Sequence, residues 1–327
     1  MRKAIVLLAG LGLGLAAAAA EAKSYTLTLC GASPGGLWSL LGAGIDSAMK
    51  DAFPGSTVTY QTSGGGFANV ALLGQKKCEL AIIHDAELQV AKEGGAPFTA
   101  PVEGLRTVAV LYNWAPMQFI VTKSFAEEHG ISSLDDIAKN KAPIRIMLNR
   151  RGNIASQLGQ AFLDATGASL EGIESWGGQV IFAASKEQGT LIKDRRADAI
   201  FNSLFVGHRS VRQVAAAVDM VILPISDPVI ATVAEAWSIA PYTIKGGSYA
   251  FQPADVATVT LSAQLVADAG LDDATAYDVT KAIVEKIDKL QGVHKAMRPL
   301  TDELLADGKV VPYHSGAAKY YKEVGLQ

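Results

Sequence analysis

The stretch from Gly31 to Gly36 reads Gly-Ala-Ser-Pro-Gly-Gly and matches the G-x-S-x-G pattern that surrounds the nucleophilic serine of many hydrolases. In those enzymes the residue after the serine donates its backbone N–H to the oxyanion, but here that residue is Pro34, which has no N–H. Losing one oxyanion donor costs about 3 kcal/mol of transition-state stabilisation. None of the five histidines stands in a motif that would mark it as the base. We therefore expect no catalytic residues and no enzymatic activity, with an exported hydrolase as the alternative.

The same turn has the chemistry of an anion-binding site. An apolar run at 25–30 predicts a strand before it, and apolar residues at three-to-four spacing predict a helix over 38–52. Backbone N–H groups at the start of a helix attract negative charge, and a serine hydroxyl adds a donor. The alternative is that the glycines only permit a tight turn. The ligand-binding residues predicted here are Ser33, Gly35, Gly36 and Trp38.

A second glycine turn follows the strand predicted at 57–61 and precedes a helix predicted at 67–73. It reads Ser63-Gly64-Gly65-Gly66, and we expect Ser63, Gly65 and Gly66 to contact the same ligand. The turn lacks the lysine and hydroxyl residue that complete a phosphate-binding P-loop, and neither turn reads G-x-G-x-x-G. The sequence also has no metal-binding spacing of His or Cys. It therefore predicts no nucleotide cofactor and no metal.

A third strand, predicted at 80–83, ends at His84-Asp85. The Asp85 carboxylate would accept an ammonium group from an amino-acid ligand, or it would cap the following helix. Strand, turn and helix alternate through this region, which predicts a parallel sheet with its turns on one edge. Ligands bind at that carboxyl edge in open α/β sheets, so Asp85 joins the predicted ligand-binding residues.

The pattern restarts later in the chain. A strand predicted at 144–148 is followed by Arg150, Arg151, Gly152 and Asn153, and then by a helix predicted at 154–166. A guanidinium at the carboxyl end of a strand can bind a carboxylate through two hydrogen bonds, and the alternative is a solvated arginine pair. Another strand, predicted at 197–201, ends at Asn202. The ligand-binding residues predicted in this region are Arg150, Arg151, Asn153 and Asn202.

These elements predict an α/β fold with two lobes, a hinge and a central ligand cleft. The chain is expected to cross into the second lobe near 118–121 and to return at 256–261. The predicted organisation is a signal peptide at 1–22, the first part of lobe 1 at 23–118, lobe 2 at 119–250 and the return to lobe 1 at 251–327. Hydrophobic residues make up 49% of the chain, enough for large cores, and the net charge of −3 predicts no nucleic-acid partner.

The chain begins Met1-Arg2-Lys3, runs without charge from 4 to 20, and then reads Ala20-Glu21-Ala22. A basic start, a short apolar core and an Ala-x-Ala ending describe a secretory signal peptide, with cleavage expected after Ala22. The alternative is an uncleaved anchor, although a membrane span needs about 20 apolar residues. We therefore expect a periplasmic protein.

The chain has two cysteines, Cys30 and Cys78. An exported protein can form a disulfide. If the strands beside them are parallel neighbours, however, the cysteines lie at opposite ends of the sheet. The gap is then about five residues of about 3.3 Å each, which is too far to bridge. The sequence therefore predicts two free, buried thiols.

Four stretches of the chain resemble the TAXI receptors, which are solute-binding proteins of TRAP transporters. Ser33-Pro34-Gly35-Gly36 with Trp38 resembles the family's first motif, T-G-S-P-G-G-T-W. Ser63-Gly64-Gly65-Gly66 with Asn69 resembles the second, T-G-G-S-x-x-N, and 79–83 resembles the strand that follows, A-D-L-A-I-V. The most specific match is the tail at 311–323, which is similar to P-x-H-P-G-A-x-x-Y-Y-K-E.

The resemblance implies a type II periplasmic-binding-protein fold and a non-catalytic receptor that binds a small carboxylate by lobe closure. The ligand class implied is a dicarboxylate, a 2-oxoacid or a glutamate-like amino acid, and the partner implied is the membrane permease of a tripartite TRAP transporter. Residues 150–153 stand where the family has G-S-G-T, and 84–86 stand where it has Q-S-D. These departures favour an oxo- or plain dicarboxylate over an amino acid. The alternative is a receptor of the same fold that serves an ABC transporter or a sensor kinase.

Overall fold

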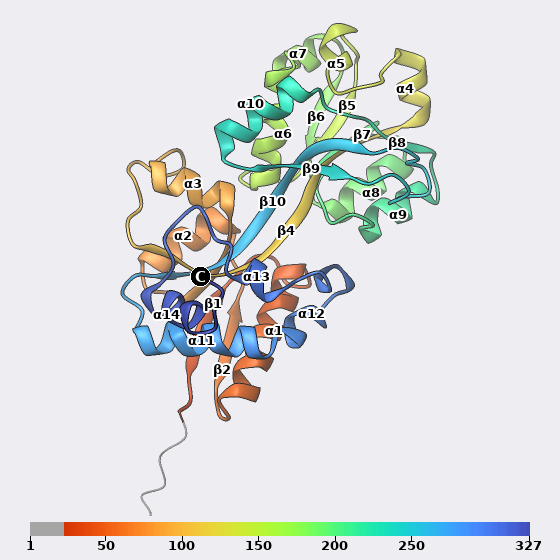
Figure 1. Ribbon diagram of the computed structural model, residues 1–327. Coiled ribbons are helices and arrows are strands. Elements are labelled where there is room, and N and C mark those ends of the chain that lie inside the picture. Colours follow the sequence, from red (N-terminus) through yellow and green to blue (C-terminus); the bar gives the residue numbers. More distant parts are fainter. Residues whose placement is uncertain (1–22) are drawn as a thin grey trace, which may run out of the picture.

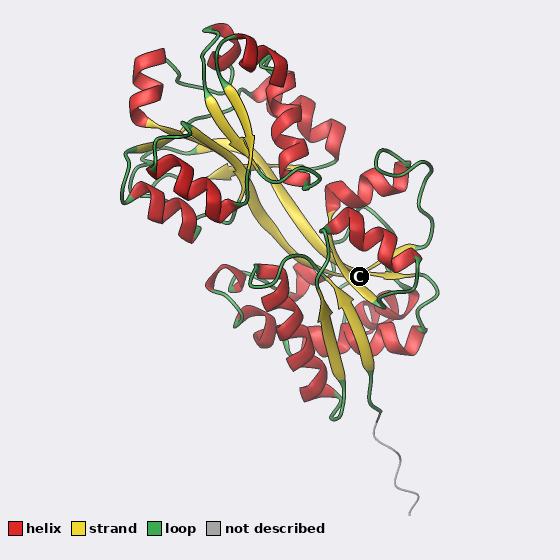
Figure 2. Cartoon of the chain, turned by 180° about the vertical axis from the view of Figure 1, so that it is seen from behind, coloured by secondary structure: helices red, strands yellow, loops and turns green. Residues whose placement is uncertain are grey.

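The computed structural model describes residues 23–327, which form two α/β lobes connected by two long strands (Figures 1 and 2). These strands are β4 (Leu105–Thr122) and β10 (Val256–Asp268), which pair antiparallel and run through both lobes. The strand order is β2-β1-β3-β10-β4-β7-β5-β6, with β8 paired to β4 and β9 paired to β10. A single sheet therefore continues from one lobe into the other.

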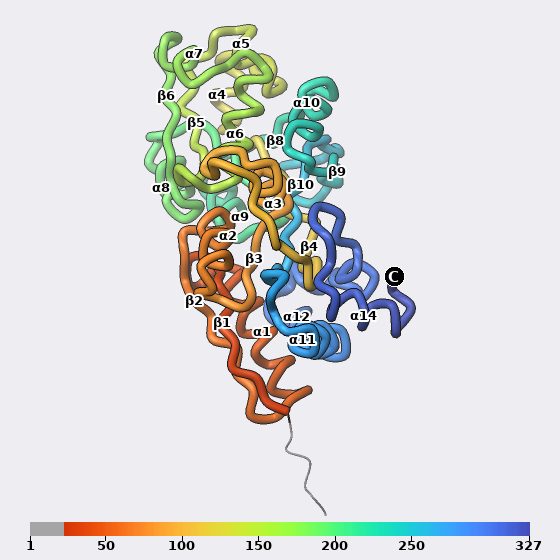
Figure 3. The backbone as a smooth tube through the Cα atoms, turned by 90° about the vertical axis from the view of Figure 1, so that its left-hand side faces the viewer, coloured from red at the N-terminus to blue at the C-terminus, as the bar shows by residue number. Residues whose placement is uncertain are grey.

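Lobe 1 contains three parallel strands, β1 (Thr26–Cys30), β2 (Thr57–Gln61) and β3 (Leu80–His84). Its first helices are α1 (Leu37–Ala52), α2 (Gly66–Gly74) and α3 (Asp85–Glu93). The chain after β10 adds α11 (Asp273–Glu285), α12 (Ile287–Gln291), the 3₁₀ turn η1 (Lys295–Met297), α13 (Asp302–Leu305) and α14 (Ser315–Glu323). Figure 3 shows α11 and α14 side by side in this lobe, and α1 packs against both α11 and α12.

Lobe 2 contains the parallel strands β5 (Arg145–Leu148), β6 (Gln179–Phe182) and β7 (Ala199–Ser203), together with β8 (Met220–Ile222) and β9 (Ala240–Ile244). Its helices are α4 (Lys123–His129), α5 (Asp136–Lys139), α6 (Ile154–Ala165), α7 (Leu170–Ser175), α8 (Ser185–Lys193), α9 (Arg209–Ala215) and α10 (Asp227–Trp237). No helix among residues 23–327 has the length and apolar character that crossing a membrane requires.

The directions of the strands make the carboxyl edges of the two lobes face each other. β3 and β4 are both antiparallel to β10, so β1, β2 and β3 point along β4 toward lobe 2. β7 is antiparallel to β4, so β5, β6 and β7 point back toward lobe 1. Along β4, the end of β3 is level with Tyr112 and the end of β7 with Met117. Five positions of strand, about 17 Å, therefore separate the two edges.

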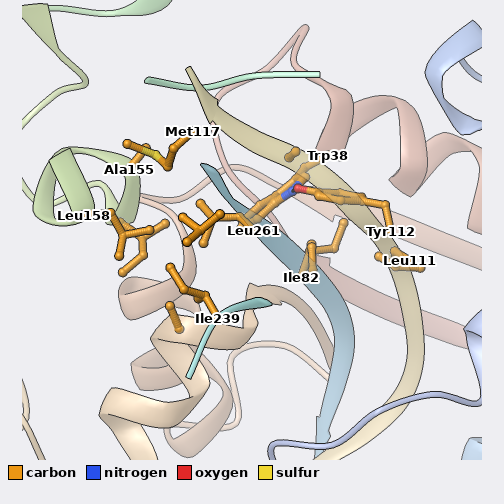
Figure 4. Packing of buried hydrophobic residues seen from close by; sticks show 14 of the residues in the cluster. Trp38, Ile82, Leu111, Tyr112, Met117, Ala155, Leu158, Ile239 and Leu261 are labelled. Carbon is orange, nitrogen blue, oxygen red and sulfur yellow. The ribbon is translucent and has the colours of Figure 1, made fainter. Parts of the chain in front are cut away.

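The hydrophobic core is continuous through the hinge. One buried cluster extends from α1 and β3 in lobe 1 to α6 and α10 in lobe 2. Figure 4 shows Leu261 of β10 at its centre, between Tyr112 on one side and Leu158 and Ile239 on the other. Packing of this kind ties the connecting strands to both lobes, so the hinge has a defined resting geometry.

Most predicted strands and helices are present, but α4, α7, α10 and β9 were not predicted, and two predicted elements differ in the structure. The runs predicted as separate at 105–111 and 118–121 form one strand, because Pro116 has an extended conformation that a strand accepts. The helix predicted at 274–290 is broken at Lys286 into α11 and α12. The predicted lobe boundaries at 118 and 250 stay predictions, since β4 and β10 belong to both lobes. The predicted signal peptide at 1–22 lies outside the described residues.

The prediction of free thiols is wrong, because Cys30 and Cys78 form a disulfide with their Cα atoms 5.9 Å apart. The prediction assumed that the ends of β1 and β3 are level. In the structure the strands are staggered, so that Cys30 at the end of β1 pairs with Ala81 near the start of β3, and the chain bends at Glu79 just ahead of β3. Both cysteines therefore reach the same small buried cluster beside α2.

Candidate functional site

The first turn, residues 31–36, presents an open set of hydrogen-bond donors. Ser33, Gly35 and Gly36 are exposed, and no hydrogen bond within residues 23–327 occupies the Ser33 hydroxyl. Gly36 is the N-cap of the 16-residue helix α1, and no side chain caps that helix. Gly35 has φ 75°, a left-handed conformation that favours glycine. The N–H groups at the start of α1 are therefore available to an anion.

The side chain of Tyr60 on β2 packs against the first turn at Gly31 and Ala32. Its hydroxyl accepts a hydrogen bond from the Ala32 N–H at 2.6 Å and lies 3.1 Å from the Ala32 carbonyl oxygen. A Cβ placed on Gly31 would lie 2.2 Å from the Tyr60 ring, so only glycine permits this approach. Burial raises the pKa of Tyr60, which keeps its hydroxyl protonated. The turn is thus held in shape before any ligand arrives.

The second turn, residues 62–66, uses its polar groups internally. The Ser63 hydroxyl accepts from the Gly65 N–H at 3.0 Å and lies within hydrogen-bond reach of the Gly31 carbonyl oxygen and of Asn69 Oδ1. Asn69 is fully buried, and its Nδ2 donates to the carbonyl oxygens of Gly31 at 2.9 Å and Ile82 at 2.8 Å. Ser63 and Asn69 therefore fasten the second turn to the first turn and to β3. They do not point at a ligand.

Position 66 requires glycine because a buried carboxylate packs against it. A Cβ at Gly66 would lie 1.7 Å from Glu87 Oε2, so this buried carboxylate sits directly against the first residue of α2. The positive end of the α2 dipole thus already has an internal anion. Among the predicted residues of the second turn, Gly65 has φ 110° and open space around an added Cβ, but its N–H already donates to the Ser63 hydroxyl.

Glu87 is one end of a chain of buried side chains that the sequence reasoning missed. Its Oε2 lies 3.1 Å from His84 Nδ1, His84 Nε2 lies 3.3 Å from the Tyr112 hydroxyl, and Trp38 Nε1 donates to that hydroxyl at 3.0 Å. Burial raises the pKa of Tyr112, so its hydroxyl stays protonated and can donate to His84. Trp38 therefore packs in this chain as a buried residue. Of the contacts in this chain, sequence spacing indicated only the one between His84 and Glu87, which are three residues apart.

Asp85 lies apart from both turns. It is the first residue of α3, whose N-cap is His84, and its Oδ1 accepts from Gln264 Nε2 at 2.8 Å. Burial raises the pKa of Asp85, while hydrogen bonds from Gln264 and Ser262 lower it by less. Asp85 is directed toward β10 and a pocket beside it.

In lobe 2 the arginine turn, residues 149–153, lies at the edge that faces lobe 1. Arg150 and Arg151 are both exposed, and the Arg151 guanidinium carbon lies 3.8 Å from the centre of the Phe182 ring. Stacking on a ring leaves the in-plane N–H donors of the guanidinium free. No ion pair engages either arginine within residues 23–327. Phe182 was not foreseen, because it comes from a neighbouring strand.

The two predicted asparagines of lobe 2 have structural partners. Asn153 is the N-cap of α6, where its Oδ1 accepts from the Ala155 N–H at 2.9 Å. Asn202 is fully buried and its Nδ2 donates to Gln188 Oε1 at 3.0 Å and Ser185 Oγ at 3.1 Å. Both side chains order the edge of lobe 2 that carries the arginine turn.

The structure thus brings the first turn and the arginine turn to facing edges, and the Ser33 hydroxyl and the Arg150 and Arg151 guanidinium groups form no hydrogen bond or ion pair within residues 23–327. The Asp85 carboxyl group is directed toward β10 instead. Five other predicted residues make contacts inside the protein, namely Ser63, Gly66, Trp38, Asn153 and Asn202. Within residues 23–327 no three His, Cys, Asp or Glu side chains cluster as a metal site would require.

Two α/β lobes, two connecting strands and facing carboxyl edges define a type II periplasmic-binding-protein fold. The solved structure of the periplasmic binding protein BugD has a TM-score of 0.53 at 12% identity, covering 93% of this chain and 98% of that one. MatC from Rhodopseudomonas palustris, with bound malate, has a TM-score of 0.55 at 13% identity, covering 92% and 97%. PhnD1 from Prochlorococcus marinus, in complex with methylphosphonate, has a TM-score of 0.55 at 11% identity, covering 93% and 97%.

Family membership follows from the match of a family model to nearly the whole described chain. The model of the NMT1-like family matches residues 29–325, and the chain belongs to that family.

Proposed function

We propose that this protein is the extracytoplasmic receptor of a tripartite TRAP transporter of the TAXI type. It binds a small carboxylate between its lobes and delivers it to the membrane permease. The four motif resemblances support the transporter class. The fold supports a receptor that closes on its ligand, and two proteins of that fold hold the anions malate and methylphosphonate.

The observation that carries the proposal is the pairing of the first turn with Arg151. The first turn offers the Ser33 hydroxyl and the N–H groups of Gly35 and Gly36 at the start of α1. Arg151, held by Phe182 on the facing edge, offers a flat guanidinium. A dicarboxylate or 2-oxoacid has two polar ends for these two groups. The Asp85 carboxyl group is directed toward β10 instead, so it would not bind the amino group of an amino acid held between the first turn and Arg151.

Closure of the lobes needs a ligand that favours the closed state. A shift from 1:99 to 99:1 takes about 5.5 kcal/mol of differential binding. A hydrogen bond to a charged group contributes about 1.5–3 kcal/mol. Three or four such bonds, divided between the first turn and Arg151, supply that amount.

No cofactor or catalytic residue is required for this function, and the proposed location is the periplasm. Lobe 1 is 23–118 with 251–327, and lobe 2 is 119–250.

The test begins with native mass spectrometry of the purified protein, which identifies any retained ligand, followed by calorimetry with that ligand or with malate. Arg151→Ala is expected to weaken binding by about tenfold to a hundredfold, the value of one to two charged hydrogen bonds. Arg150→Ala is the matched control, because it removes the same charge from the adjacent residue and should change affinity less than threefold. Equal affinities of Arg151→Ala and the parent protein would contradict the arginine contact.

The partner is tested separately. Ligand uptake by vesicles that contain a TRAP permease is expected to depend on this protein. Uptake supported only by an ABC permease, or ligand-dependent activation of a sensor kinase, would favour the alternative receptor classes.

A further inference from the structure

A cavity lies between the lobes at the hinge, away from the first turn and the arginine turn. It has a volume of about 420 Å³ and is lined by the start of α3, the hinge strands β4 and β10, the segment entering β9, and the loop after α13. We call it the hinge pocket. Cavities of this size hold small organic molecules. Because its walls come from both lobes, an occupant would contact both sides of the hinge.

Asp85 gives the hinge pocket an unbalanced negative charge. No basic side chain forms an ion pair with Asp85 within residues 23–327, and its hydrogen-bond donors, Gln264 and Ser262, are neutral. The other charged residues of the wall are Asp307 and Lys309, which pair with each other at 3.0 Å and so nearly cancel. Asp307 also raises the pKa of Asp85, as a nearby like charge does. The wall of the hinge pocket therefore carries a net negative charge, which Asp85 supplies.

The rest of the wall is suited to a short organic group. Val110, Ile239 and Leu304 supply apolar surface, while Asn113 and Thr260 line the pocket from the hinge strands. Two neutral donors occupy at most two of the roughly four acceptor positions of a carboxylate. The remaining positions can accept hydrogen bonds from an ammonium group.

From this arrangement we propose that the hinge pocket is a second binding site, which takes a small organic amine in its ammonium form. The ammonium group binds Asp85, and the alkyl part lies against Val110, Ile239 and Leu304. The site is independent of the proposed carboxylate receptor function, because it shares no lining residue with the first turn or the arginine turn. Binding there would favour one angle between the lobes, since the ligand contacts both.

The test uses n-butylammonium chloride as the probe, with n-butanol and sodium butyrate as neutral and anionic probes of the same length. Saturable binding of butylammonium to the full-length protein is measured by NMR titration at neutral pH. Butanol and butyrate are expected to bind at least about tenfold more weakly, because one charged hydrogen bond is worth that factor. No saturable binding of butylammonium, or equal binding of butanol, would overturn the proposal.

Two variants locate the site. Asp85→Asn keeps the shape and the Gln264 contact and is expected to weaken butylammonium binding about tenfold. Asp51→Asn makes the same charge change on α1, where Asp51 pairs with Lys289 outside the pocket, and should leave binding unchanged. Unchanged binding to Asp85→Asn would overturn the assignment. Malate binding is measured on the same samples, so that a failure of either site is seen independently of the other.

Discussion

The first and second turns look alike in sequence and differ in the structure. Each follows a parallel strand, contains a serine and three glycines, and leads into a helix. In the first turn the Ser33 hydroxyl and the N–H groups at the start of α1 are open. In the second turn the Ser63 hydroxyl bonds Gly65 and lies against Asn69, and Gly66 lies against Glu87. One turn is available for binding, while the other builds the support for it.

The difference shows that a donor's availability depends on its neighbours. Asn69 comes from α2 and Glu87 from α3, so both partners of the second turn lie on later elements of the chain. Asn69 also bonds the Gly31 carbonyl oxygen, which connects the second turn to the base of the first. The comparison therefore predicts that damage to the second turn lowers stability, and that damage to the first turn lowers ligand affinity.

The largest effect is expected from the disulfide at the base of the first turn. Cys30 directly precedes Gly31, and its bond to Cys78 closes a loop with a sequence separation of 48. In the chain-entropy treatment such a loop is worth about 4 kcal/mol. Reduction should lower the free energy of unfolding by about that amount in guanidinium titrations with and without a phosphine reductant. The Cys30→Ala/Cys78→Ala variant is the control and should not respond to the reductant. A parent protein that also fails to respond would contradict the bridge.

The next largest effect is a difference in stability between alanine substitutions at two glycines of α2. Gly66→Ala places a Cβ against the Glu87 carboxylate and is expected to cost about 1–3 kcal/mol, as overpacking does. Gly74→Ala, at the other end of α2, meets nothing within 4 Å and should be neutral or stabilising by up to about 1 kcal/mol. Thermal unfolding of both variants checks the contrast. Equal stabilities would mean that Glu87 does not lie against the second turn.

A serine pair tests the two turns directly. Ser63→Ala leaves the Gly65 N–H and the buried Asn69 Oδ1 atom without a partner and should cost about 1–3 kcal/mol of stability. Ser33→Ala, at an exposed position, should change stability by less than about 0.5 kcal/mol. Calorimetric affinity for the ligand should show the reverse, with the direct loss in Ser33→Ala. A Ser33→Ala variant with lower stability and parental affinity would reverse the roles assigned to the turns.

The smallest effect concerns Asp85, the polar residue after the third strand. Burial raises its pKa in the folded state, so at neutral pH its charged form opposes folding. Asp85→Asn should therefore raise the melting temperature at pH 7. The gain should shrink as the pH falls through the raised pKa and vanish below the ordinary range of an aspartate. A gain that is independent of pH would show that charge is not its cause.

The local pattern of the chain was enough to predict the order of most strands and helices, although α4, α7, α10 and β9 were not predicted. Bounds such as 57–61 for β2 follow from β-branched residues between turn residues, and glycines mark the turn before α1. The same pattern predicted a two-lobed α/β fold with polar turns on facing edges, because alternating strands and helices form parallel sheets. These features depend on residues close together in sequence.

Only the tertiary structure decided which polar groups are free. The stagger of β1 against β3 brings Cys78 to Cys30, the Phe182 ring stacks against Arg151, and Glu87 reaches the start of α2. Each of these contacts joins residues on different elements, so it depends on strand register and loop path, which local spacing does not encode. A hydroxyl or N–H is available to a ligand only when no distant side chain satisfies it first, and that condition is set by packing.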